Sequence, residues 1–239
     1  MALLAMIAAC FCARSFAMLE STFLYFPGHS TERSNLALWS VDGQAIGVCR
    51  EVAAPKMVWL VFYGNAGQAS QRGYIVDCLP GTDSVYVMEY PGYGFRDGTP
   101  SMQSINAAAV EAYAALKRSH PGQDIGVLSE SLGSGPACHL CSLPNPPSRA
   151  VLIMPFDNLL SVAKEHIWFL PVSLLMRDRW DNVACLSKYS GRVDIYGGTV
   201  DEVIPIAHAR NLARSVPRAV FHEIPCAHNE WSVLVKIED

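Results

Sequence analysis

Two mainly apolar runs constrain the fold more than any other feature of this sequence. They cover residues 56–63 (KMVWLVFY) and 84–90 (SVYVMEY), and each is closed by a glycine or a Pro-Gly pair. Uninterrupted β-branched and aromatic runs of this length are typical of strands that are buried on both faces. Such strands occur in sheets with helices above and below them. The runs therefore favour a parallel sheet at the centre of the molecule.

The rest of the chain alternates between helix and strand signals. Helix formers fill residues 69–78 and 104–118, and the second stretch ends at the stop signal Pro121-Gly122. Four further strand-like runs cover residues 124–129, 149–154, 192–196 and 219–224. This order predicts an α/β fold with a mainly parallel sheet and helices on both faces. Ligands bind beyond the carboxyl ends of the strands in such sheets, so catalytic residues are expected there.

Composition narrows the class of protein. The chain has 239 residues, 51% of them hydrophobic and 17% charged, and its formal charge is −4. A chain of this length and apolar content forms one packed domain, and without a long basic run we expect no nucleic-acid partner. The eight cysteines are scattered, so we expect buried thiols. Cys138 and Cys141 have a C-x-x-C spacing but no second ligand pair, so we expect no metal and no cofactor.

The amino terminus is unusually apolar. Residues 1–13 (MALLAMIAACFCA) have no charged side chain, and Arg14 is the first charge. We interpret residues 1–19 as a targeting or anchor segment with possible membrane contact, which makes the protein membrane-associated or exported. The run is short for a spanning helix. A signal peptide cleaved near Ala17, a helix docked on its own domain and a cytoplasmic location all stay open, as does the oligomeric state.

A serine between a strand and a helix is the first candidate catalytic residue. Ser131 lies in Ser-Glu-Ser-Leu-Gly, directly after the strand predicted at residues 124–129. A sharp strand-turn-helix needs small residues on both sides of the nucleophile, and Ser129 and Gly133 are small. The alternative is an ordinary helix start capped by Ser131.

A second turn follows the first buried strand, in the sequence Tyr63-Gly64-Asn65-Ala66-Gly67. Backbone N–H groups in a small-residue turn of this kind can stabilise a developing oxyanion. Paired with the Ser131 turn, it predicts an oxyanion hole formed by the N–H groups of Asn65 and Leu132. Taken alone, it is simply the end of a strand.

An acid and a histidine follow the last two predicted strands. Asp201 lies in GGTVDEVIP and His228 in CAHN, which gives the order Ser, Asp, His along the chain. We expect Ser131 to attack a carbonyl, His228 to transfer the proton and Asp201 to orient the imidazole. Asp157, after the strand at residues 149–154, is an alternative acid. Asp194, Glu202 and Glu230 are interpreted as surface or loop charges, and His208 and His222 as structural.

The motifs FYGNAG, YPGYG, SESLGS, GGTVDEVIP and AHNEW resemble, in their order and spacing, those of the serine α/β-hydrolase superfamily. The sequence is most similar to its branch of short-lid esterases, acylglycerol lipases and protein depalmitoylases. The resemblance spans about residues 20–235 and implies an α/β-hydrolase domain over residues 20–239. Two positions depart from the family pattern: Tyr63 replaces a histidine, and Ser129 replaces a glycine.

The segment between the strands predicted at residues 149–154 and 192–196, around residues 158–190, corresponds in this fold to a short lid. It contains Trp168 and Phe169, which we expect to contact an apolar substrate. A helix that buries its apolar face on the sheet is the alternative.

These observations predict a serine hydrolase that cleaves carboxylic esters through an acyl-enzyme without a cofactor. A thioesterase or an amidase would use the same three residues, so the sequence does not separate the three bonds. A catalytically inactive binding protein of the same fold is the alternative from another class. It is motivated by Tyr63 and Ser129.

Overall fold

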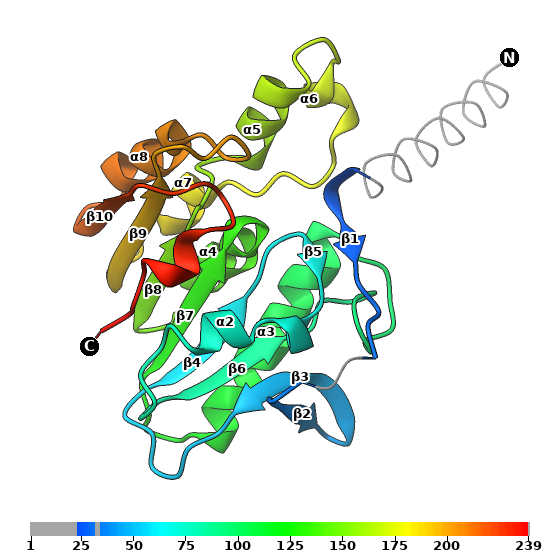
Figure 1. Ribbon diagram of the computed structural model, residues 1–239, viewed down its shortest axis with the longest axis vertical. Helices are drawn as coiled ribbons and strands as arrows, with labels where there is room; N and C mark the ends of the chain where they lie inside the picture. Colours follow the sequence, from blue (N-terminus) through cyan, green and yellow to red (C-terminus); the bar gives the residue numbers. More distant parts are fainter. Residues whose placement is uncertain (1–22, 32–33, 239) are drawn as a thin grey trace, which may run out of the picture.

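A mixed eight-stranded sheet forms the centre of the protein (Figure 1). The computed structural model describes residues 23–31 and 34–238. The strand order is β10-β9-β8-β7-β4-β6-β3-β2, and a small second sheet pairs β1 with β5. The strands are β1 (Phe26–Pro27), β2 (Ala37–Val41), β3 (Gln44–Arg50), β4 (Val58–Phe62), β5 (Ala66–Gly67), β6 (Ser84–Met88), β7 (Ile125–Glu130), β8 (Arg149–Ile153), β9 (Arg192–Gly198) and β10 (Ala219–Ile224).

Parallel pairing runs without a break from β10 to β6, and β3 and β2 are antiparallel at the edge. Every residue of β4, β6, β7 and β8 is buried. This confirms the predicted mainly parallel sheet and its strands buried on both faces.

Seven helices of the described chain surround the sheet, with three short 3₁₀ helices. The helices are α2 (Gly73–Val76), α3 (Met102–Ser119), α4 (Ser134–Cys141), α5 (Leu159–His166), α6 (Val172–Leu175), α7 (Asn182–Leu186) and α8 (Ile206–Ser215), and the 3₁₀ helices are η1 (Ala69–Gln71), η2 (Ser131–Gly133) and η3 (Trp231–Val233). Helix α3 packs against α4, α4 against α7, and α7 against α8. In Figure 1, α2 and η3 lie in front of the sheet.

Two elements differ from the prediction. The helix expected at residues 69–78 is divided into η1 and the four-residue α2, because Arg72 leaves the helical conformation between them and Gly73 is a poor helix former. The β2–β3 hairpin was not predicted. Its turn is Asp42-Gly43, with positive φ at both residues, which suits a tight hairpin turn.

The predicted lid-like insertion, residues 158–190, contains α5, α6 and α7. In Figure 1, α5 and α6 stand away from the sheet. The segment at residues 1–19 lies outside the described residues, so the structure does not test the interpretation of an anchor. Among residues 23–31 and 34–238, no helix is both long and apolar enough to cross a membrane.

Candidate active site

Ser131 sits in a strained turn at the carboxyl end of β7. Its φ is +52°, in the left-handed region that non-glycine residues rarely adopt, and its side chain is nearly buried. Such strain is typical of a nucleophile placed on a sharp strand-to-helix turn. The close approach also explains Gly133, where a Cβ would lie 2.4 Å from the carbonyl oxygen of Phe62. Ser129 stays inside β7, paired with Phe62 and Leu152, so the turn accommodates serine there.

Ser131, His228 and Asp201 form one chain of hydrogen bonds. With Nδ1 protonated, His228 accepts at Nε2 from Ser131 Oγ at 2.9 Å and donates from Nδ1 to Asp201 Oδ2 at 2.7 Å. The other carboxylate oxygen accepts from the backbone N–H groups of Val203 and Ile204, both at 2.8 Å. These two bonds fix the carboxylate toward the imidazole. The structure therefore brings together the three residues that the sequence selected.

The turn at residues 63–67 lies beside the serine. A Cβ built on Gly64 would be 3.7 Å from the Cβ of Ser131, an ordinary van der Waals contact, so the turn and the serine are immediate neighbours. The carbonyl of Asn65 accepts from Phe26 N–H and from the Tyr93 hydroxyl, at 2.9 and 2.8 Å. Leu132 directly follows the serine in η2. Of the two expected oxyanion donors, Asn65 thus belongs to the turn beside Ser131 and Leu132 to the turn of Ser131 itself.

Tyr63 braces the turn where the family pattern has histidine. Its hydroxyl donates to Glu89 Oε1 at 2.5 Å, and the same carboxylate accepts from the N–H of Ala69 at 3.0 Å. One buried carboxylate therefore connects the start of the turn to η1, which follows it. Burial raises the pKa of Glu89, although the hydrogen bonds from Tyr63 and Ala69 oppose this. Tyr63 also stacks on Tyr90, with ring centroids 4.4 Å apart.

A second buried carboxylate, Glu130, connects the serine turn to the histidine loop. Its oxygens accept from Trp231 Nε1 at 2.6 Å and from the Tyr74 hydroxyl at 2.7 Å. Burial, and then the charge of Glu130, raises the pKa of Tyr74. Sequence reasoning missed this link. The available signal was a glutamate at the end of a mainly apolar strand, since a buried carboxylate needs donors.

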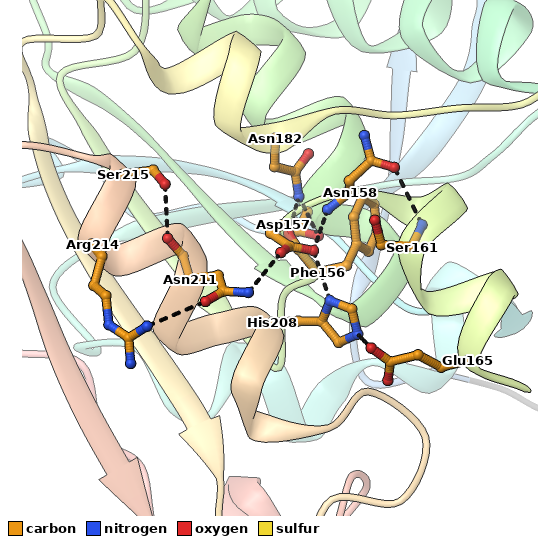
Figure 2. A network of polar contacts seen from close by, with 11 residues as sticks. Phe156, Asp157, Asn158, Ser161, Glu165, Asn182, His208, Asn211, Arg214 and Ser215 are labelled. Atoms are coloured by element: carbon orange, nitrogen blue, oxygen red, sulfur yellow. Dashed lines mark hydrogen bonds and ion pairs between the residues drawn. The ribbon is translucent and has the colours of Figure 1, made fainter.

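The alternative acid, Asp157, binds a different imidazole (Figure 2). Its Oδ1 lies 2.7 Å from His208 Nδ1, and His208 Nε2 lies 3.3 Å from Glu165 Oε1. The side-chain amide of Asn211 donates to Asp157 Oδ2 at 3.3 Å. Asp157 therefore links the loop before α5 to α8, and His208 contacts Asp157 and Glu165.

One of the charges interpreted as surface groups is buried. Asp194 lies in β9 with 1% of its surface exposed, and both Arg149 and Arg192 reach its Oδ2 at 3.0 Å. The interpretation of Asp194 as a surface or loop charge is wrong, because the arginines on β8 and β9 compensate its burial. His222 lies 3.5 Å from the same carboxylate.

Trp168 and Phe169 are exposed rather than packed around Ser131. Their exposed fractions are 81% and 67%, and their rings contact each other edge to face. A surface hollow of about 410 Å³ lies elsewhere and contains none of the predicted site residues. It is lined by Ser34, Asn35, Leu36, Ser70, Gln71, Gly73, Tyr74 and Asp77.

The C-x-x-C pair lies inside α4. Cys138 and Cys141 are buried free thiols, and burial raises the pKa of each. Cys49, Cys78 and Cys226 are buried as well, in agreement with the prediction, while Cys185 is half-buried. Among the residues that the structure describes, no group of three or more His, Cys, Asp or Glu side chains is placed to hold a metal ion.

Comparison with solved structures identifies the fold. An esterase from Pyrococcus furiosus superposes with a TM-score of 0.65 at 12% identity, covering 88% of this chain and 94% of that one. The chain therefore has the α/β-hydrolase fold, which confirms the predicted fold class.

The sequence relatives include one protein without an assigned function and one lipase that matches over a smaller part of the chain. An uncharacterized protein of Mycobacterium tuberculosis is 30% identical over 181 residues, 73% of this chain and 64% of the relative. A lysophosphatidylserine lipase, ABHD12, of Danio rerio is 27% identical over 165 residues, 61% of this chain and 42% of the relative. The chain thus spans less than two thirds of either relative. No protein-family model matches it.

Proposed function

We propose that the protein is a serine hydrolase that cleaves carboxylic esters through an acyl-enzyme. The observation that carries the proposal is the buried chain from Ser131 through His228 to Asp201, with the serine in a strained turn at the end of β7. The fold shared with an esterase and the sequence similarity to a lysophospholipid lipase support an ester substrate.

The hydrogen-bond chain supports one role for each of the three residues. Ser131 Oγ attacks the ester carbonyl carbon while His228 Nε2 takes its proton, and Asp201 stabilises the resulting imidazolium. The N–H groups of Asn65 and Leu132 stabilise the oxyanion of the tetrahedral intermediate. The ester C–O bond then breaks, and His228 returns the proton to the alcohol. Water repeats the sequence on the acyl-enzyme and releases the acid.

A fluorophosphonate tests the nucleophile without requiring the natural substrate. We expect stoichiometric modification of Ser131, seen by mass spectrometry, and its loss in Ser131→Ala. The same variant should lower ester turnover by about 10⁴- to 10⁶-fold. Ser129→Ala is the matched control, because it removes a hydroxyl two residues away inside β7 and should keep the labelling. A folded wild-type protein that is not labelled would instead indicate the inactive binding protein.

Thioesters and amides remain alternative substrates because the same residues serve all three bonds. Matched oxygen-ester, thioester and anilide substrates with one acyl group separate them. We expect the highest kcat/KM on the oxygen ester. A higher value on the thioester would redefine the enzyme as a thioesterase while keeping the roles of Ser131, Asp201 and His228.

A further inference from the structure

The lid-like insertion presents a group of exposed apolar side chains, which we call the crown. It consists of Trp168, Phe169, Leu170 and Leu174, and the two most exposed members, Trp168 and Leu174, are 81% and 83% exposed. No charged residue occurs between Ile167 and Met176. Large apolar side chains gathered on one projecting segment are characteristic of an interaction surface.

The helix that precedes the crown, α5, contacts the loop that carries the proposed catalytic acid. His166, at the end of α5, contacts the backbone oxygen of Val203 through Nε2 at 2.8 Å. Val203 is itself half-exposed and follows Asp201 by two residues. A surface that covers the crown therefore also approaches the edge of the candidate active site.

The same segment is tied to the amino-terminal end of the described chain. The Tyr25 hydroxyl donates to Asp178 Oδ2 at 2.5 Å, and Phe23, the first described residue, is exposed. The preceding residues 1–19 have the apolar sequence interpreted as an anchor. If residues 1–19 enter an apolar phase, this contact holds the crown close to it.

Charge favours a lipid surface over a basic partner. Residues 158–180 carry three basic side chains, Lys164, Arg177 and Arg179, against two acidic ones, Glu165 and Asp178. This gives the crown's surroundings a charge of +1 in a chain of −4. Basic residues around exposed tryptophan and leucine suit the interface of a membrane that contains anionic lipid.

We propose that the crown inserts into the surface of an anionic lipid bilayer and holds the mouth of the candidate site at the interface. Where this concerns the substrate, it rests on the proposed function, because an ester dissolved in the membrane would then reach Ser131 without crossing water. Docking itself needs no catalysis and is tested separately.

Trp168 makes the test specific. The chain has five tryptophans, all in the described residues, and the other four are at most 7% exposed. None lies in residues 1–22, so an anchor alone gives no tryptophan signal. We use the full chain with Ser131→Ala and vesicles of brominated phosphatidylcholine containing phosphatidylserine. The expected result is a blue shift and bromine quenching of Trp168 fluorescence, both lost in Trp168→Phe.

A second pair of variants measures the crown's contribution. Phe169→Gln with Leu174→Gln should raise the lipid concentration for half-maximal quenching at least about tenfold, because two large apolar side chains are then no longer buried in the lipid. Leu38→Gln with Val233→Gln is the matched control, because both residues are exposed but lie on β2 and η3, away from the crown. This pair should leave the quenching unchanged.

Three outcomes would overturn the proposal. Sedimentation of the chain with vesicles without quenching of Trp168 would make the amino-terminal segment the sole contact. A blue shift that appears with protein concentration in the absence of lipid would assign the crown to a second copy of the chain. An equal loss of quenching in the crown pair and the control pair of variants would show that the crown is not the part of the surface that binds lipid. Because fluorophosphonate labelling of the wild-type chain is independent of vesicles, failure of docking is distinguishable from failure of the proposed function.

Discussion

Two aspartates that follow neighbouring strands bind different histidines. Asp201, after β9, contacts His228, and Asp157, after β8, contacts His208. The sequence placed both acids at strand ends, and it favoured Asp201 through the order of the motifs. That order also paired Asp201 with His228, but nothing in the sequence indicated His208 as the partner of Asp157, because that contact depends on how α8 packs.

The pairing predicts opposite effects for two identical substitutions. Asp201→Asn should lower kcat by about 10⁴-fold, because the amide no longer holds the productive imidazole tautomer. Asp157→Asn should leave kcat unchanged but lower the free energy of unfolding by about 1–2 kcal/mol, through the weakened bonds to His208 and Asn211. Ester kinetics and urea unfolding of both variants check this. A large loss of kcat in Asp157→Asn alone would reverse the assignment of the acid.

The buried carboxylate of Glu89 predicts a pH dependence of stability. Burial raises its pKa in the folded state above the value in the unfolded chain, so the folded protein binds the proton more tightly. Its contribution to stability is therefore greatest at acid pH and falls as pH rises through the raised pKa. Glu89→Gln keeps an acceptor for Tyr63 but does not titrate.

Urea unfolding of wild type and Glu89→Gln from about pH 4 to about pH 8 measures the difference. We expect the unfolding free energy of the wild type, relative to the variant, to decrease as pH rises. Parallel curves over the whole range would show that Glu89 has the same pKa in both states. Other carboxylates contribute equally to both proteins, so they cancel in this comparison.

At the scale of elements, the strand-turn-helix around Ser131 requires a glycine at position 133 but not at position 129. A Cβ at position 133 would meet the backbone oxygen of Phe62 at 2.4 Å, and β4 cannot retreat because it is buried between β6 and β7. Ser129 already carries a side chain at the family's glycine position, within regular strand pairing.

We therefore expect Gly133→Ala to lower the free energy of unfolding by about 3 kcal/mol. Because the added Cβ displaces the turn, the rate of fluorophosphonate labelling at Ser131 should fall as well. Ser129→Gly should label at the wild-type rate. The measurement is the labelling rate together with thermal unfolding of each variant. A marked gain of the labelling rate in Ser129→Gly would mean that the side chain of Ser129 limits the reactivity of Ser131.

Elements were predictable where the hydrophobic pattern was strong. The strands β4, β6, β7 and β8 are buried on both faces, and their apolar runs identified each of them. The β2–β3 hairpin was not predicted because β2 is mostly exposed and its apolar and polar residues alternate only weakly. Its Asp42-Gly43 turn was the available signal. The exposure of Trp168 and Phe169 was not predictable, since an apolar segment looks the same whether it packs inward or projects.

At the scale of the whole molecule, the edge of the sheet farthest from the hairpin is held by a buried charge cluster. Asp194 on β9 forms ion pairs with Arg149 on β8 and with Arg192 on its own strand. His222 on β10 lies 3.5 Å from the same carboxylate. Arg149 also donates to the carbonyl of Glu238 at 2.8 Å, which ties down the carboxyl-terminal end of the described chain. None of these residues is in the hydrogen-bond chain of Ser131, so the cluster should affect stability separately from catalysis.

Asp194→Asn tests that separation. The substitution leaves the guanidinium of Arg149 buried without its counter-charge, and a broken buried pair costs about 3–5 kcal/mol, which for a chain of this size lowers Tm by about 10 °C. We expect kcat per labelled active site to remain unchanged. Arg210→Ala is the matched control, because it breaks the exposed ion pair between Arg210 on α8 and Glu223 on β10 and should leave Tm nearly unchanged. Equal changes in Tm for the two variants would mean that burial of Asp194 contributes nothing to holding β8, β9 and β10 together.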